Sequence, residues 1–365
     1  MPSAETNMVT GFSHLVFEIT NKCDLACRQC YASSGKKFAN PSLESILHVL
    51  KRLRELNTRE ILLSGGEPTV RTDLVAVFRY CSEIGMPIIL STNGMVDSSL
   101  AKSISRYCEQ VDVSLRGSNR EQFEHITRVP GSYSAMRRGI RRLSEAQASL
   151  NLNYDLTSAN YRHLYDAVAE LAEEGIGVKR TWVQRTSMRG RATSESAEGL
   201  GLLVLDDYHD VLEQMHTIET AYRVKCRMID PLPLCLVPLE HHHLILESRY
   251  GYDWAAVGTE GLLRRDPVDP LSTVGSVFEE NIMSSWNTDP DLQRFRSLDW
   301  LRSVCTPCQL RGKCKGGFCA STPLSEGRDH GYRADALIDR YRDLITPFTY
   351  DATKQRRPSS PQCPV

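Results

Sequence analysis

The sequence lacks the features that would place it in a membrane or outside the cell. No apolar run approaches the roughly 20 residues of a membrane-spanning helix, and the first residues lack the basic and apolar regions of a signal peptide. An excess of charge of one sign is also lacking, because 44 basic residues stand against 45 acidic ones, so no overall field would attract nucleic acid or an anionic membrane. We therefore expect a cytoplasmic protein without nucleic-acid or membrane partners.

The chain also lacks internal repeats and the composition of a disordered protein. Hydrophobic residues make up 41% and charged residues 24%, values typical of a folded globular chain. A length of 365 residues accommodates a large α/β barrel with a smaller module. Of the 12 cysteines, most fall in two tight clusters, which in a reducing compartment favours metal binding over disulfides.

Short apolar runs alternate with amphipathic segments in the first half of the chain, the pattern of repeated βα units. Strands are expected at 14–20, 60–64, 87–91, 111–115, 150–156 and 178–183. A complete barrel of this type has eight units, so six units predict an open, partial (β/α)6 TIM-like barrel, with its reaction site in the loops after the strands.

The weaker periodicity after this region predicts a division of the chain. The barrel is expected over residues 12–191, a bridging region over 192–260, and a small cysteine-rich iron–sulfur module over 261–348. Residues 1–11 and the polar, proline-containing residues 349–365 are expected to be a flexible N-terminus and a flexible tail.

The first cysteine cluster follows the first expected strand. Cys23, Cys27 and Cys30 have the spacing C-x3-C-x2-C, and three thiolates on a four-iron cluster leave one iron open for a ligand. The spacing alone also fits a zinc site or an incidental group of thiols. The segment SGGEP at 64–68 follows the second strand, and its two adjacent glycines allow a backbone to approach a ligand closely.

Four segments at successive strand ends, ITNKCDLACRQCYASSG, LSGGEPTVRTDL, LSTNG and VSLRG, resemble the radical S-adenosylmethionine (SAM) superfamily over roughly the first 190 residues. The resemblance implies a SAM-binding 4Fe-4S cluster that cleaves SAM to a 5'-deoxyadenosyl radical, which removes a hydrogen atom from the substrate. It further implies a flavodoxin- or ferredoxin-type electron donor. Its site residues would be the cluster ligands Cys23, Cys27 and Cys30, the loop Gly65, Gly66, Glu67 and Pro68 that receives the SAM amino group, and Ser91, Asn93, Ser114 and Asn153 around the ribose and carboxylate.

Two positions depart from the pattern of that family. Gln29 precedes the third cysteine, where an aromatic residue is common, so the adenine would be contacted differently or by Tyr31. Arg116 stands in the segment SLRG where an acidic residue is common. It would either reach an anionic or carbonyl-bearing group of the substrate or lie solvated on a loop.

The second cysteine cluster, Cys305, Cys308, Cys314 and Cys319, has the spacing C-x2-C-x5-C-x4-C, which suits zinc or an iron–sulfur cluster. Because it follows a radical SAM barrel, this segment resembles the SPASM and twitch modules. The resemblance implies one auxiliary 4Fe-4S cluster on these four cysteines. The last spacing is four residues where SPASM modules usually have three. Other possible ligands, extra or exchanged, are Cys235, Asp266 and Cys363.

Two further cysteines lie in the bridging region, where Cys226 or Cys235 would either donate a hydrogen atom to a substrate radical or serve packing. The run His241, His242 and His243 is expected in a surface loop, because consecutive residues cannot all face one metal.

The expected function is a radical SAM enzyme that epimerises, dehydrogenates or otherwise tailors a small, polar, sugar-bearing intermediate of natural-product biosynthesis. Few residues precede the first strand, which disfavours the winged-helix domain that many peptide maturases carry. The alternative is a peptide maturase that crosslinks or epimerises a ribosomally made precursor. A non-catalytic iron–sulfur electron carrier is a remote alternative, because a carrier has no need of the loop at 64–68.

Overall fold

The computed structural model describes residues 8–38, 40–187, 189–193, 200–201, 203–269, 272–317 and 335–345. The expected flexible tail at 349–365 and most of the expected flexible N-terminus at 1–11 lie outside these ranges.

A single ten-stranded sheet organises the molecule, in the order β10-β9-β8-β1-β2-β3-β4-β5-β6-β7. All pairs from β8 through β1 to β7 are parallel, and β8, β9 and β10 are joined antiparallel. The strands are β1 (His14–Glu18), β2 (Ile61–Ser64), β3 (Ile88–Thr92), β4 (Gln110–Leu115), β5 (Leu150–Leu156), β6 (Val178–Arg185), β7 (Lys225–Met228), β8 (Trp254–Val257), β9 (Leu262–Arg264) and β10 (Thr273–Ser276).

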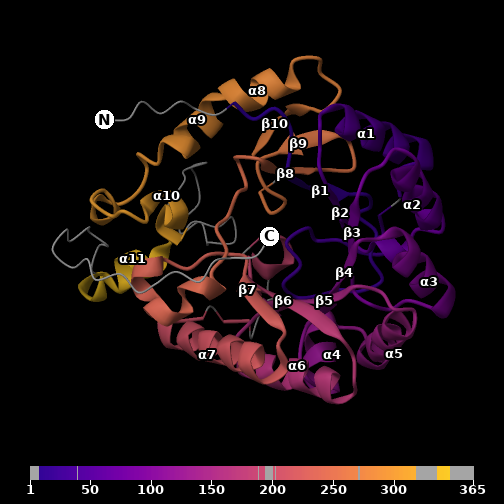
Figure 1. Ribbon diagram of the computed structural model, residues 1–365, viewed down its shortest axis with the longest axis horizontal. Coiled ribbons are helices and arrows are strands. Elements are labelled where there is room, and N and C mark those ends of the chain that lie inside the picture. The colour runs from indigo at the N-terminus through magenta and orange to yellow at the C-terminus, as the bar shows by residue number, and fades with distance from the viewer. Residues whose placement is uncertain are drawn as a thin grey trace, which may run out of the picture.

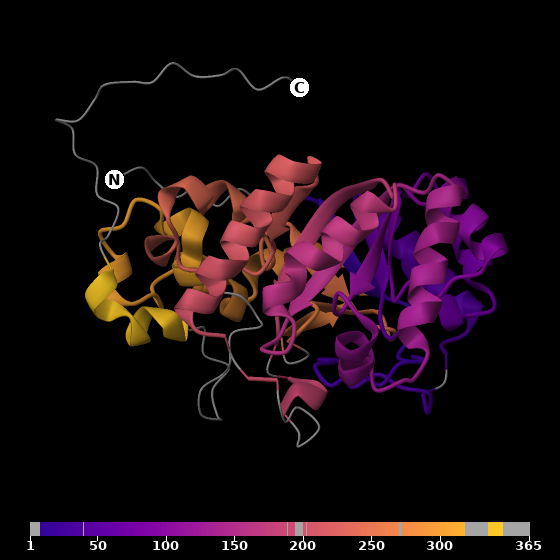
Figure 2. The same cartoon turned by 90° about the horizontal axis from the view of Figure 1, so that it is seen from below.

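Helices surround the curved sheet, and those that follow the first six strands cover its outer face (Figure 1). Figures 1 and 2 place α10 and α11 at the end of the molecule opposite α2 and α3. The helices are α1 (Leu43–Glu55), α2 (Leu74–Glu83), α3 (Ser98–Tyr107), α4 (Arg120–Thr127), α5 (Ser132–Glu145), α6 (Leu164–Glu173), α7 (Leu205–Tyr222), α8 (Ile282–Thr288), α9 (Pro290–Ser297), α10 (Arg311–Cys314) and α11 (Ala336–Arg340).

The two faces of the sheet differ in chemistry. Side chains alternate along a strand, and register partners on parallel strands share a face. Val113, Leu152 and Val183 lie on the outer face, fully buried in the hydrophobic core under the helices. The inner face carries mostly polar side chains: Glu18, Ser64, Ser91, Asp112, Ser114, Asn151, Asn153, Asp155, Arg180, Trp182, Gln184 and Arg227.

A polar inner face is unusual for this architecture, because the interior of a complete barrel is packed with bulky apolar side chains. At the base of the sheet these groups bond one another, since the Asn151 amide donates to Asp112 at 2.8 Å and to Gln110 at 2.7 Å. Burial raises the pKa of Asp112 to about 6.

The partial parallel barrel expected from the sequence is confirmed, and each of its six strands is present. The sheet is wider than expected, because β7 and β8 add parallel strands at its two sides. The expected domain limits stay a prediction. The sheet continues across both predicted boundaries, at residues 191 and 260. Strands β7 and β8 lie between these residues, and β9 follows the second one.

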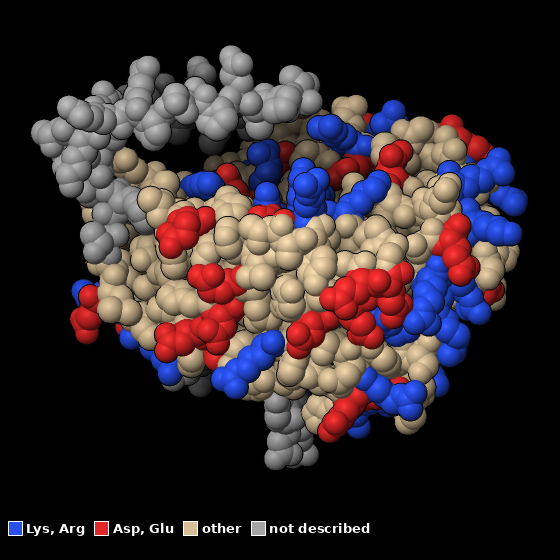
Figure 3. Space-filling view, turned by 60° about the horizontal axis from the view of Figure 1, so that its bottom comes forward, with Lys and Arg blue, Asp and Glu red and all other residues tan. Residues whose placement is uncertain are grey.

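No helix in the described part of the chain is long and apolar enough to cross a membrane. Acidic and basic side chains lie side by side on the face shown in Figure 3, as expected for a formal net charge of -1.

Candidate active site

The first three cysteines lie in a loop that follows β1 and folds back on itself. The Cys23 amide donates to Gly35 O at 3.3 Å, and the Gly35 amide donates to Asn21 O at 3.2 Å. Within the loop the Cys30 amide donates to Cys27 O at 3.3 Å. These bonds occupy backbone groups and leave the three half-buried thiols as ligands.

Neighbouring elements hold this loop from outside. The Ala26 amide donates to Thr127 O at 3.1 Å and the Arg28 amide to Ile126 O at 2.9 Å, which docks the loop on the end of α4. Helix α4 begins after Asn119, whose side chain accepts a hydrogen bond from the Gln122 amide at 3.1 Å, the usual N-cap arrangement.

Burial raises the pKa of the Cys23 thiol to about 12 and that of Cys27 to about 11. Charge on Cys27 raises the first value further, and charge on Cys30 raises the second, so the three sulfurs interact electrostatically. The raised pKa values favour the protonated thiols. Metal coordination reverses this preference, since a metal-bound thiol is deprotonated.

The two glycines after β2 are required by a close approach of two backbones. The Gly66 amide donates to Thr20 O at 2.6 Å, and the Glu67 amide donates to Lys22 O at 2.9 Å. A Cβ atom on Gly65, where φ is +129°, would lie 2.2 Å from Thr20 O, and one on Gly66 would lie 2.2 Å from Lys22 O. The loop at 64–68 is therefore built directly onto the start of the cysteine loop.

The buried Glu67 carboxylate braces two strand ends. It accepts hydrogen bonds from the Thr92 hydroxyl at 2.7 Å and from the Asn93 amide at 2.6 Å. It also caps the short 3-10 helix Pro68–Val70 through Thr69. Burial raises the pKa of Glu67 to about 7. Its side chain is fully engaged with the protein, as are the backbone amides of Gly66 and Glu67.

Asn93 connects the hydrogen bonds of Glu67 to the cysteine loop. Its side-chain amide donates to Asp24 Oδ1 at 2.7 Å, and its oxygen accepts from the Met95 amide at 2.9 Å. The structure thus directs the Asn93 side chain to Asp24, between the first two cysteines. Contact of this side chain with SAM would compete with that bond.

Arg116 lies inside the site and is not a solvated loop residue. It forms an ion pair with Asp155, and both side chains are 16% exposed. Its positive charge lowers the pKa of Cys27, which places the guanidinium beside the first cysteine cluster. A contact with a substrate group stays a prediction for this residue.

Tyr31 is half-buried and lies beside Glu18 on the inner face of β1. Burial raises its pKa well above the ordinary value, and the Glu18 charge raises it further. Glu18 also accepts a hydrogen bond from Arg264 at 2.6 Å. The hydroxyl of Tyr31 therefore lies close to the ion pair of Glu18 and Arg264. A contact of its ring with the adenine stays a prediction.

Several buried polar atoms among the described residues have no protein partner. Five of these atoms lie at the site, namely both amide atoms of Gln29, Ser34 Oγ, Asn153 Oδ1 and Asp155 Oδ1. Nearly all buried polar atoms in folded proteins are hydrogen-bonded, so such atoms call for a ligand or water. They lie in the cysteine loop or on the inner face of β5. Together with the three thiols they fit the SAM and iron–sulfur chemistry expected at this edge. Ser91 and Ser114 lie on the same inner face, and Ser114 is paired in register with Asn153.

Three cysteines of the second cluster, Cys305, Cys308 and Cys314, line one cavity together with Cys235. Cys319 and Cys363 lie outside the described residues. The buried Asp266 accepts hydrogen bonds from the Val268 and Asp269 amides, at 3.0 and 2.8 Å. Its carboxylate thus stabilises the turn that follows it. In the described part of the chain no three ligand side chains converge as they would on one ion. Thiolates that bind separate irons of a cluster do not need to converge.

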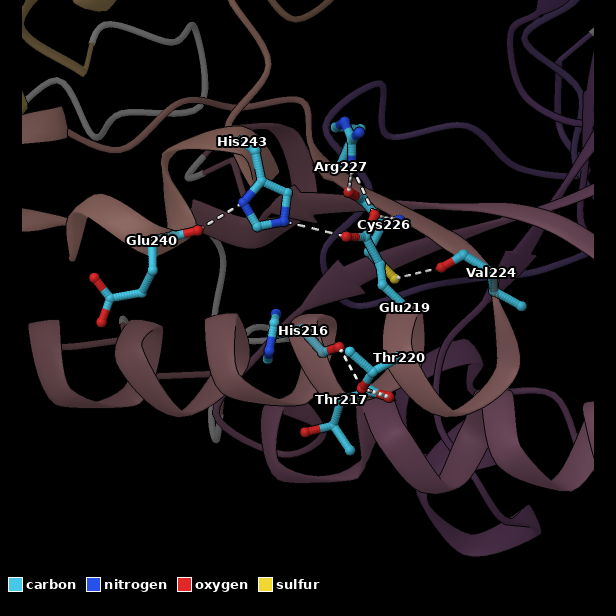
Figure 4. A network of polar contacts seen from close by, with 9 residues as sticks. All are labelled: His216, Thr217, Glu219, Thr220, Val224, Cys226, Arg227, Glu240 and His243. Atoms are coloured by element: carbon cyan, nitrogen blue, oxygen red, sulfur yellow. Dashed lines mark hydrogen bonds and ion pairs between the residues drawn. The ribbon is translucent and has the colours of Figure 1, made fainter. Parts of the chain in front are cut away.

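Cys226 lies on the opposite face of the sheet from the site. It is fully buried, and its thiol lies 3.7 Å from Val224 O, on the side facing α7 (Figure 4). Its register partner Thr181 belongs to the outer face. The hydrogen-donor role suggested for Cys226 needs a thiol that faces the inner side, and the structure directs this one away.

The histidine run forms a 3-10 helix, Leu239–Leu244, and not a surface loop. His241 is buried, with its ring 5.6 Å from that of His216 on α7. His243 bonds Glu219 at 3.2 Å, as Figure 4 shows, while His242 lies 3.0 Å from Leu234 O. Packing against α7 explains the burial, and the three rings have different partners.

The described part of the chain thus combines an open parallel barrel with a polar inner face and three cysteines in the loop after the first strand. Residues 17–171 match the Radical SAM superfamily. These residues form a radical SAM domain, and the chain is an enzyme that uses SAM and a SAM-binding 4Fe-4S cluster.

Two curated relatives illustrate the range of similarity. The chain is 33% identical to an Fe-coproporphyrin III synthase of Methanosarcina barkeri over 164 residues, which is 44% of this chain and only 41% of that relative. It is 26% identical to a PqqA peptide cyclase of Methylorubrum extorquens over 347 residues, covering 90% of this chain and 87% of the cyclase.

Solved structures share the fold. SuiB of Streptococcus suis bound to S-adenosylmethionine superposes with a TM-score of 0.71 at 16% identity, over 91% of this chain and 78% of SuiB. The structure of anSMEcpe with AdoMet and the Cp18Cys peptide gives 0.67 at 19% identity, over 92% of this chain and 96% of that one. At these identities the likeness concerns the fold alone.

Proposed function

We propose that this radical SAM enzyme modifies a peptide, with Cys23, Cys27 and Cys30 as ligands of its SAM-binding cluster. The similarity to PqqA peptide cyclase supports a peptide substrate, because it extends over 90% of the chain and so includes both the barrel and the C-terminal part. When bound, the cluster and SAM would supply the radical chemistry needed to abstract hydrogen from an unactivated C–H bond of the peptide. A small sugar-bearing substrate, which the sequence favoured, finds no support among these relatives.

The cysteine loop and its supports hold the cofactor end of the site. Arg191 donates to Cys27 O at 2.8 Å, and Glu67 and Asn93 fix the adjoining strand ends. Because these contacts involve backbone carbonyls and amides, they position the thiols without occupying them. The unpaired groups of Gln29 and Asn153 are available to SAM.

The inner face would orient a peptide substrate. A peptide presents amide donors and carbonyl acceptors, and the inner face offers both kinds of partner in Ser114 and Gln184. The apolar outer face and its helices close that side of the sheet to water, which protects a reactive radical from quenching.

Product analysis after anaerobic reconstitution tests this proposal. The full chain, loaded with iron and sulfide and reduced with dithionite, would be given SAM and the short peptides encoded beside its gene. We expect 5'-deoxyadenosine together with a SAM-dependent mass change in one peptide. Cys27→Ala should abolish both, and Cys81→Ala, which removes a fully buried thiol of α2, should retain both.

Deuterium labelling of the modified residue should move the label into 5'-deoxyadenosine. The proposal is contradicted if a sugar nucleotide or Fe-coproporphyrin III, offered in parallel, is converted while the peptides remain unchanged.

A further inference from the structure

Cys235 belongs to the same cavity as the second cysteine cluster, although it lies 70 residues before Cys305 in the chain. It stands in the short 3-10 helix Leu234–Leu236 that follows β7. Charges on Cys314, Cys305 and Cys308 all act on its thiol, so the four sulfurs are near neighbours. The cavity measures about 380 Å³, including some space open to solvent.

A glycine turn brings the two segments together. Gly316 and Gly317 have φ of +63° and +67°, a left-handed conformation that suits glycine. A Cβ atom on Gly317 would lie 2.5 Å from Pro233 Cδ, so the turn after Cys314 packs directly against the turn before Cys235. The Leu234 amide then donates to Cys314 Sγ at 3.3 Å.

The cavity has the character of an iron–sulfur site. Such clusters are held by four thiolates, and amide hydrogen bonds to sulfur and a hydrophobic surround tune them. Here the amide bond to Cys314 and the four sulfurs are both present. The remaining wall is mainly apolar and comes from Leu234, Val304, Leu310, Ile338 and Ile345.

We propose that Cys235 is the fourth ligand of the auxiliary 4Fe-4S cluster, together with Cys305, Cys308 and Cys314. The ligand set then comes from two segments that the glycine turn joins, and Cys319 is not part of it. A sulfur bound to iron cannot donate a hydrogen atom, so Cys235 is a structural ligand and not the donor that the sequence suggested. This assignment rests on the proposed function only in requiring that the module carries a cluster.

Iron analysis of the full chain tests the assignment. In a background with Cys23→Ala, Cys27→Ala and Cys30→Ala, only the auxiliary cluster remains, and about four irons per chain are expected. Adding Cys235→Ala should reduce the iron content and replace the Mössbauer signature of a complete four-iron cluster by a damaged or absent one. Two matched controls, Cys319→Ala and Cys226→Ala, should keep about four irons and the intact signature.

A conservative variant separates ligation from folding. Cys235→Ser keeps the size of the side chain, so the unfolding temperature of the iron-free protein should match that of the parent while the Mössbauer spectrum of the loaded protein changes. The proposal is overturned if Cys235→Ala retains the complete cluster, or if Cys319→Ala loses it. These readouts do not depend on turnover, so a protein that loads its auxiliary cluster through Cys235 but modifies no peptide would contradict the proposed function alone.

Discussion

Arg191 Nε donates a hydrogen bond of 2.8 Å to the carbonyl oxygen of Cys27. The same residue donates its backbone amide to Cys30 O at 3.0 Å and its guanidinium to Ser34 O. Arg191 follows β6 while Cys27 follows β1, so this contact joins the two ends of the barrel core across the site. Gly190 permits the approach, because a Cβ atom there would lie 2.1 Å from Tyr31 O.

Replacing this arginine should loosen the cysteine loop. Arg191→Ala removes the donors to two carbonyl groups, which should lower the free energy of unfolding by about 1–3 kcal/mol and speed the loss of iron to a chelator. Arg138→Ala on α5 removes an exposed arginine and should change neither quantity. Equal rates of iron loss in the two variants would show that the contact does not restrain the loop.

The glycine pair after β2 offers a second test. Gly66→Ala places a methyl group on Lys22 O, so we expect a loss of at least about 2 kcal/mol in the free energy of unfolding and poor cluster assembly. Gly177→Ala is the matched control, because no atom lies within 4 Å of its added Cβ and its φ is not positive. Urea unfolding and iron content measure both effects. Normal cluster assembly in Gly66→Ala would contradict the close packing of the two loops.

The strands of the barrel could be predicted because each is a short apolar run bounded by turns. Val111 and Val113 alternate with Asp112 and Ser114, and this period of two marks both the strand and its two faces. The charged, four-residue β7 has no such run, which is why a bridging region was expected there. The added width of the sheet comes from the pairing of β7 with β6 and of β8 with β1, a tertiary effect that the local sequence does not contain.

The candidate site was predictable only in part. The spacing of Cys23, Cys27 and Cys30 is local and therefore visible in the sequence. The bond from Asn93 to Asp24 and the position of Cys235 in the second cavity depend on how distant loops meet. Donation and packing both stayed open for Cys226, because a four-residue strand gives too little pattern to tell its inner side chains from its outer ones.

Breaking the ion pair of Arg116 and Asp155 should lower the free energy of unfolding strongly. Asp155→Asn leaves a largely buried guanidinium without its counter-charge, so a loss of about 3–5 kcal/mol in the free energy of unfolding is expected. The double variant Arg116→Met with Asp155→Leu removes both charges and should be closer to the parent. Chemical unfolding of the iron-free proteins compares the three. A double variant as unstable as the single one would indicate a role in packing rather than in charge balance.

The buried Glu67 should make stability depend on pH. Its pKa is raised from 4.5 to about 7, so between these values the folded protein holds a proton that the unfolded chain has released. Stability from this group is therefore complete below pH 4.5 and declines as the pH rises to about 7, by up to about 3 kcal/mol. Glu67→Gln cannot titrate, and its amide cannot accept all the bonds made by the carboxylate.

The difference in unfolding free energy between the parent and Glu67→Gln should consequently shrink as the pH rises from 4.5 to 7. It is best measured on the iron-free protein, where no cluster competes for the neighbouring thiols. Glu44→Gln, on the exposed first turn of α1, should give a difference that does not change over this range. Asp112 titrates in the same direction in both proteins and cancels in the comparison. A constant offset between parent and Glu67→Gln would mean that Glu67 is already ionised at pH 4.5, held so by the donors of Thr69, Thr92 and Asn93.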